Sequence, residues 1–291
     1  MLFEQPTFKT GILPRFDDWR LTCRYVLETE VHVYAFSMAA NILLSFFPFM
    51  IVMISLCRHV LHWPAAEQAI YIALNDFFPD DRFGQFIINN LKVIVAQRGP
   101  FQITSVLLLL FTANGIFEPL EVALNRAWGI RKNRSYARNQ IVSLGLIFAC
   151  GGLALLSTVL TALNQQFLMQ LGGGSHTSAF IGSTVFKIAA LPVSILMLFL
   201  IYWVLPNAKI PAAPLLPVAL IVGVALEVLK NLNLWTWPWL RAKLQHEYGP
   251  FVYSVTIVLW SFLASMIVLA GAEWAARKRL PPGLPQAEPV H

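Results

Sequence analysis

Long apolar runs, separated by short polar segments, dominate this sequence. A helix that crosses the hydrocarbon core of a bilayer needs about 20 mainly apolar residues. Six runs have this character, and they cover residues 33–57, 101–117, 140–163, 180–205, 212–234 and 251–272. Lipid admits only helices and closed barrels, and no run alternates apolar with polar residues as a barrel strand does. We therefore expect an all-α polytopic membrane protein with six transmembrane helices and short amphipathic interfacial helices.

The polar segments divide the chain into three parts. We expect a cytoplasmic N-terminal segment, a six-helix transmembrane domain and a disordered, proline-rich cytoplasmic tail, at residues 1–32, 33–276 and 277–291. Short amphipathic helices are predicted at 21–30, 65–78 and 82–97, the last two within an outer-side helical loop at 58–100. The apolar face of the last helix lies on the membrane surface, the reading we favour, or roofs a cavity.

Composition and charge exclude two classes of protein and give an orientation. Hydrophobic residues make up 57% of the chain and charged residues 12%, with a mean hydropathy of +0.63. So few charged side chains would not cover the apolar surface of a soluble enzyme. So apolar a chain would collapse and would not stay disordered. The net charge is +6, and Lys and Arg gather in cytoplasmic loops of membrane proteins. They are more numerous in the segments on the side of the two termini, which predicts that both termini are cytoplasmic.

No metal or cofactor motif is recognisable. The 3 cysteines are far apart and form no Cys-x-x-Cys pair. Of the 6 histidines only His59 and His62 lie close together, and no acidic ligand accompanies them at a zinc-site spacing. A nucleotide-binding loop and a Gly-x-Ser-x-Gly elbow are both missing. We expect no cofactor, no metal and no nucleic-acid partner, and an enzymatic activity is not favoured.

Charged residues inside the predicted spans are the most informative positions. Lys187 interrupts the fourth span, and Glu227 and Lys230 interrupt the fifth. A charge at the centre of a span costs about 2.5–3.5 kcal/mol on insertion scales. By helical rise, Lys187 and Glu227 lie at a similar depth, and Asn231 shares a helix face with Glu227 and Lys230. These residues either line a cavity that binds an anionic headgroup or relays a proton, or they form a structural ion pair.

Other polar residues could complete such a cavity or form a second site. A cavity at the depth of Glu227 would need further polar side chains, for which the candidates are Asn41, Ser45 and Asn114. A second cluster is predicted near the cytoplasmic face, and its members are Glu118, Glu121, Asn125, Arg126 and Glu273. That cluster is either a gate or headgroup site, or a set of salt bridges at helix ends.

The segment after the second span carries two further signals. Pro119 suits the first turn of a helix, so we expect a new helix to begin there. A basic run follows, made of Arg131, Lys132, Arg134 and Arg138. We expect this run to meet anionic lipid headgroups at the cytoplasmic leaflet.

Several motifs in this chain resemble those of a known family. They are AANILLSFFP at 39–48, GIFEPLE leading to LNRAWG at 115–129, YWVLPN at 202–207, and YG at 248–249 followed by LW at 259–260 and GAE at 271–273. In order and spacing they are similar to the YihY/BrkB family of bacterial inner-membrane proteins, formerly labelled ribonuclease BN-like. Two positions depart from the family pattern. Trp203 stands where members usually have a basic residue, and Asn41 where many have Leu or Ala, so ligand preference could differ here.

The resemblance implies six helices in the bacterial cytoplasmic membrane but no settled biochemical activity. We favour a protein that transports or flips a lipid or another amphiphile through a polar intramembrane cavity. Two alternatives stay open: a structural protein for envelope assembly without transport, and a membrane-bound enzyme. The expected partners are membrane lipids, including anionic headgroups, with a homo-oligomer or an envelope protein as further candidates.

Overall fold

The computed structural model describes residues 16–27, 29–77, 81–96, 100–130, 134–171, 192–208 and 210–277. These residues form helices joined by short turns and contain no strand, so the all-α prediction is confirmed. The α-helices are α1 (Phe16–Val26), α2 (Thr29–Ser55), α3 (Pro64–Phe77), α4 (Asp81–Ala96), α5 (Pro100–Ala127), α6 (Tyr136–Leu171), a helix over Pro192–Val204, α8 (Leu215–Tyr248) and α9 (Val252–Arg277). A π-helix, η1 (Leu56–Val60), continues α2, and a 3-10 turn, η2 (Gly249–Phe251), joins α8 to α9.

Within the described residues, four helices are long and apolar enough to cross a membrane. They cover Glu30–Val60, Ala137–Leu156, Leu215–Tyr248 and Val252–Ala276, and they correspond to the first, third, fifth and sixth predicted spans. The second predicted span lies within α5, whose 28 residues extend about 42 Å at the rise of an α-helix. The fourth is described only from Pro192 onward. Six spans therefore remain a prediction.

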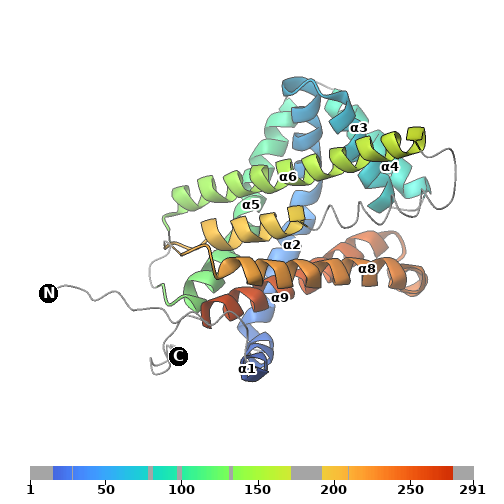
Figure 1. The fold of residues 1–291 in the computed structure, drawn as a ribbon. Helices are drawn as coiled ribbons and strands as arrows, with labels where there is room; N and C mark the ends of the chain where they lie inside the picture. The colour runs from blue at the N-terminus through green and yellow to red at the C-terminus, as the bar shows by residue number, and fades with distance from the viewer. Residues whose placement is uncertain are drawn as a thin grey trace.

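Three helix pairs organise the described part of the molecule. α2 packs along α5 and also against α9, and α9 packs along α8. In Figure 1, α2 runs across the direction of α6, α8 and α9, while α3 and α4 lie together at one end and α1 at the opposite end. The helices of the 58–100 segment are thus separated from α1 by the length of α2.

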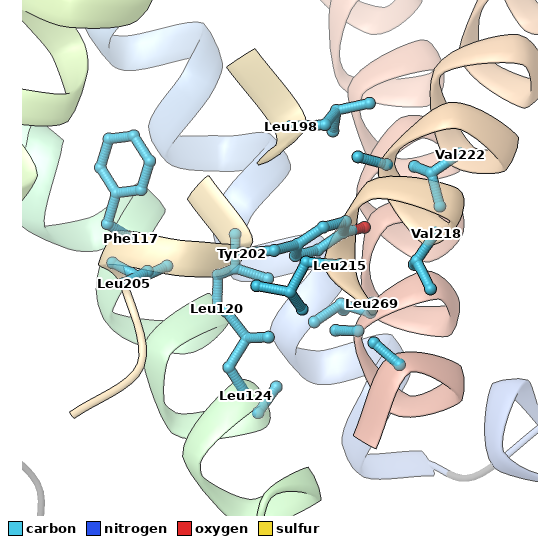
Figure 2. Packing of buried hydrophobic residues seen from close by; sticks show 14 of the residues in the cluster. Phe117, Leu120, Leu124, Leu198, Tyr202, Leu205, Leu215, Val218, Val222 and Leu269 are labelled. Atoms are coloured by element: carbon cyan, nitrogen blue, oxygen red, sulfur yellow. The ribbon is translucent and has the colours of Figure 1, made fainter. Parts of the chain in front are cut away.

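The main core gathers around Tyr202, whose side chain is completely buried. Figure 2 shows side chains of α5, the 192–204 helix, α8 and α9 converging on this ring. Among them are Leu120, Leu215, Val222 and Leu269, all of which are buried. One aromatic side chain therefore ties four helices together, and this packing fixes the α8–α9 pair against the rest of the bundle.

A second core lies where the end of α2 meets α3 and α4. The helices predicted at 65–78 and 82–97 are found as α3 and α4, each within one residue of the expected bounds. Ile87, Leu91 and Val95 of α4 are buried in this core, whereas Phe86 is exposed. The apolar stripe of α4 therefore packs mainly on its own chain.

Three helix ends differ from the sequence prediction. α5 continues through Pro119, so no new helix begins there; neighbouring helices can stabilise a proline inside such a segment. α8 runs to Tyr248, well beyond the predicted end at 234, because the segment after the tryptophans contains good helix formers. It stops where Gly249 adopts φ 52° and its N–H donates to the Gln245 carbonyl. The amphipathic helix predicted at 21–30 lies instead at Phe16–Val26.

Candidate functional site

The intramembrane charges predicted on the fifth span form an ion pair on α8. Lys230 Nζ lies 2.5 Å from Glu227 Oε1, one helical turn away. Asn231 Nδ2 donates to the Glu227 carbonyl oxygen at 2.8 Å, so the three residues share one face. The Lys230 side chain is 54% exposed and that of Glu227 21%. We call these three residues the α8 polar stripe.

Of the other predicted cavity residues, only Asn41 and Ser45 have side chains that the structure describes. Asn41 and Ser45 lie on α2, and their side chains donate to the carbonyl oxygens of Ser37 and Ile42 in the same helix, at 2.8 and 3.1 Å. Lys187 lies outside the described residues, and Asn114 lies in α5 but its side chain is outside the described set. The predicted meeting of Lys187 with Glu227 is therefore untested.

Asn41 has a different role in the packing of α2 against α5. A methyl group built on Gly115 would fall well inside contact distance of the Asn41 amide. Only glycine lets the two helices approach this closely at that point. Asn41, which departs from the family pattern, thus meets a residue of the 115–129 motif.

The second predicted cluster separates into three contacts. Glu121 and Asn125 are buried, and Asn125 Nδ2 donates to Glu121 Oε1 at 3.4 Å. Arg126 is exposed and forms an ion pair with Glu30 of α2. Glu273 is buried and accepts a hydrogen bond from Thr22 Oγ1 of α1 at 3.2 Å.

Two of these contacts join different helices, whereas the Glu121–Asn125 bond lies within α5, and the Arg126 pair fits the helix-end alternative. Glu118, the remaining member, has an exposed side chain at the surface of α5. Glu121 and Glu273 differ from an ordinary surface salt bridge, because both carboxylates are buried and each accepts a hydrogen bond from a neutral side chain.

Arg134 was assigned to a lipid-facing basic run, but it binds the chain itself. Its guanidinium donates to the carbonyl oxygens of Val204, Leu205 and Pro206 at 2.9, 2.9 and 3.0 Å. These carbonyls end the 192–204 helix and have no partner within it. Burial lowers the pKa of Arg134, with the Glu121 charge acting in the opposite direction and that of Arg138 adding to the decrease. Nothing in the pattern of the basic run indicates that one of its members turns inward.

Two of the motifs that carry the family resemblance, 115–129 and 202–207, meet at the same helix end. The backbone N–H of Asn207 donates to Asn125 Oδ1 at 2.9 Å, which links the 202–207 and 115–129 motifs. The Tyr202 hydroxyl donates to the Val268 carbonyl at 2.8 Å, three residues before Gly271. Trp203, the other departure from the pattern, is exposed and stacks on Phe199 with ring centres 6.1 Å apart. These motifs therefore fix helix packing, and they assemble no recognisable acid–base pair or nucleophile.

The polar side chains of the described residues determine whether they can bind a metal ion or form another polar site. Among them, no group of three or more His, Cys, Asp or Glu side chains is placed to bind a metal ion. The polar features of the described part include the α8 polar stripe, the contacts between and within helices around Arg126 and Glu273, and a group of side chains beside the π-helix.

Comparison with known proteins gives matches over most of the chain. A family model described as "Virulence factor BrkB" matches residues 22–288. A UPF0761 membrane protein of Acinetobacter baylyi is 25% identical over 215 residues, which are 72% of this chain and 49% of that protein. One from Chlorobium chlorochromatii is 25% identical over 264 residues, 86% of this chain and 56% of that protein. The ribonuclease-like protein YfkH of Bacillus subtilis is 23% identical over 280 residues, 93% of this chain and 98% of that protein.

The chain spans about half the length of the first two of these relatives. No solved structure shows a significant match to it. Because the family model covers most of the chain and several relatives are named as membrane proteins, this chain is an integral membrane protein that belongs to the BrkB family, as the YihY/BrkB resemblance indicated.

Proposed function

We propose that this chain moves a lipid or another amphiphile across the bacterial cytoplasmic membrane. In this proposal six helices span the membrane, both termini are cytoplasmic, and the polar headgroup passes along the α8 polar stripe. The observation that carries the proposal is the ion pair of Glu227 and Lys230 on a helix of spanning length. An inert apolar anchor needs no such pair.

The position of the stripe favours contact with an amphiphile. Val224 and Val228 are exposed beside Glu227, so this face of α8 is open in the described bundle. Each charge held in hydrocarbon costs about 2.5–3.5 kcal/mol on insertion scales, and pairing offsets part of that cost. A headgroup that bonds to Glu227 and Lys230 would replace hydrocarbon next to both charges. The headgroup and the stripe would therefore lower each other's cost of lying inside the membrane.

The test is a flipping assay with purified protein in vesicles that carry a fluorescent phospholipid. We expect wild type to equilibrate the lipid faster than protein-free vesicles, and Glu227→Gln to be several-fold slower. The matched control is Glu247→Gln, an exposed carboxylate near the end of the same helix, which should behave as wild type. Wild type no faster than empty vesicles would contradict transport of this lipid class. Equal rates in Glu227→Gln and wild type would contradict the assignment to the stripe.

A second candidate is a structural role in envelope assembly. It is favoured by apolar side chains exposed on α3 and α4, namely Ile72, Phe86 and Val93. Polar replacement of these three residues should then abolish crosslinking to a specific envelope protein in cells while leaving lipid flipping unchanged. The name of YfkH keeps a nuclease as a third alternative, and incubation of purified protein with tRNA tests it.

A further inference from the structure

A group of polar side chains gathers where η1 meets α3 and α4. It consists of Arg58 and His59 of η1, Glu67 and Tyr71 of α3, and Lys92 of α4, and we call it the outer-loop cluster. Arg58 Nη1 lies 3.9 Å from Glu67 Oε1. Lys92 Nζ lies 5.2 Å from the centre of the Tyr71 ring. The cluster thus links three helices and lies outside every contact described above.

The backbone beside the cluster is irregular. η1 is a π-helix over Leu56–Val60 that continues α2, and π turns inside helices occur frequently at functional sites. The chain leaves it through His62, which has a positive φ of 49°. A non-glycine residue rarely adopts this conformation without support from its surroundings. The local structure therefore holds Arg58 and His59 in positions that a regular helix end would not give.

Two buried polar atoms of the cluster lack a hydrogen bond of regular geometry among the described residues. They are His59 Nδ1 and the Tyr71 hydroxyl, and the Tyr71 hydroxyl lies close to the Glu67 carboxylate. Buried polar atoms in native proteins are nearly always bonded, to protein, water or ligand. Burial, followed by the Glu67 charge and by hydrogen bonding to the Glu67 carboxylate, raises the pKa of Tyr71 to about 12, while Arg58 acts in the opposite direction. The phenol therefore stays protonated near neutral pH and can donate a hydrogen bond.

The charges of the cluster favour an anion. Arg58 and Lys92 are positive and Glu67 is negative, so the balance is positive. The Arg58–Glu67 separation of 3.9 Å exceeds hydrogen-bond distance, and the Arg58 side chain is 44% exposed. Its guanidinium therefore retains N–H donors, and their planar fork matches the oxygens of a phosphate.

Apolar side chains stand exposed next to this site. Val60, Leu61 and Trp63 follow Arg58 directly, and all three are exposed. Arg58 itself lies at the end of the Glu30–Val60 candidate span, where a headgroup would meet the protein. Tryptophan is enriched at this level of membrane proteins. A phosphate attached to an apolar chain thus finds polar and apolar partners side by side.

We propose that the outer-loop cluster binds a phosphate group, with Arg58 and Lys92 supplying charge and the Tyr71 hydroxyl a hydrogen bond. The group belongs to a phospholipid headgroup or to free phosphate. This inference goes beyond the proposed function, because the site shares no residue with the α8 polar stripe and does not require that lipids cross the membrane.

The test measures lipid retention by native mass spectrometry on the purified full chain. The probe is an equal mixture of phosphatidylglycerol and phosphatidylcholine, and a second arm uses inorganic phosphate alone. We expect wild type to retain more phosphatidylglycerol than phosphatidylcholine, and Arg58→Gln and Lys92→Gln to lower that retention about tenfold each. Tyr71→Phe keeps the ring below Lys92 and should cause a smaller loss. The control is Lys243→Gln, since Lys243 likewise lies over an aromatic ring, that of Trp239, at 5.6 Å.

Glu67→Gln separates a binding site from a purely structural cluster. Removing this negative charge should strengthen retention several-fold, an outcome that a misfolded variant cannot produce. If inorganic phosphate displaces phosphatidylglycerol, and its binding depends on Arg58 and Lys92, the site binds free phosphate. If inorganic phosphate does not displace the lipid, the site binds the headgroup. Equal retention of both lipids by every variant, without phosphate binding, would overturn the proposal. A negative flipping assay with intact retention would count against the proposed function alone.

Discussion

Gly271 of α9 packs tightly against Val222 of α8, and its replacement by alanine tests the packing of the main core. A methyl group at this position would fall well inside contact distance of Val222 Cγ2 and 2.8 Å from the Tyr202 hydroxyl oxygen. Neither neighbour can move freely. Val222 is β-branched and buried, and Tyr202 is fully buried and bonded to the Val268 carbonyl. Figure 2 shows Tyr202 and Val222 close together in the core.

The expected magnitude follows from three terms. Overpacking a core costs about 1–3 kcal/mol. Displacing the Tyr202 hydroxyl from Val268 adds about 0.5–1.5 kcal/mol. Replacing a helical glycine by alanine gains about 1 kcal/mol. Gly271→Ala should therefore lower the free energy of unfolding by about 1–3 kcal/mol.

The assay is reversible unfolding in mixed micelles of a mild detergent and dodecyl sulfate, followed by circular dichroism. The matched control is Gly152→Ala in α6, where an added methyl group meets nothing within 4 Å, and it should be neutral or stabilising by up to about 1 kcal/mol. Adding Val222→Ala to Gly271→Ala should make the pair more stable than the sum of the two single changes. If Gly271→Ala is as stable as Gly152→Ala, the close packing described here is incorrect.

Three further predictions use the same unfolding assay. Arg134→Gln removes the donors to three carbonyl oxygens and should lower the free energy of unfolding by about 2–4 kcal/mol. Arg134→Lys should recover only a minor part of this free energy, because an ammonium lacks the guanidinium fork. Full recovery by lysine would contradict the geometry. Gly115→Ala should destabilise the protein, and Asn41→Ala should relieve that effect because it removes the amide that the methyl group meets; an additive pair would count against the contact. Folding raises the pKa of Tyr71 from 10 to about 12. Wild type should therefore lose stability relative to Tyr71→Phe as the pH rises from 10 to about 12. Parallel pH profiles of the two proteins would refute this.

The sequence predicted the all-α class, the positions of several helices and one local contact correctly. Apolar runs and turn residues were sufficient to locate α3 and α4 almost to the residue. The pairing of Glu227 with Lys230 also followed from spacing, because residues three apart on a helix are neighbours. Both results depend on short-range geometry, which the sequence encodes directly.

Contacts between distant segments could not be predicted in the same way. The carbonyl partners of Arg134 lie about 70 residues further along the chain, and a basic run looks the same whether its members face lipid or the protein. Pro119 was expected to start a helix because its local preference is clear, but packing against neighbours kept α5 continuous. The cluster around Arg58 and Tyr71 also depends on the way three helices meet, which hydrophobic periodicity does not specify.

A labelling experiment shows whether water and headgroups reach the α8 polar stripe inside the membrane. Single cysteines would replace Asn231 or Leu232, an exposed residue on another face of α8, in a variant that lacks Cys23, Cys57 and Cys150 and still flips lipid. A membrane-impermeant thiol reagent would then be applied to the reconstituted protein. Transport along the stripe predicts rapid labelling at 231, slow labelling at 232, and protection of 231 by the transported amphiphile. Equally slow labelling at both positions would mean that the stripe is sealed from water, and it would contradict a transport path along α8.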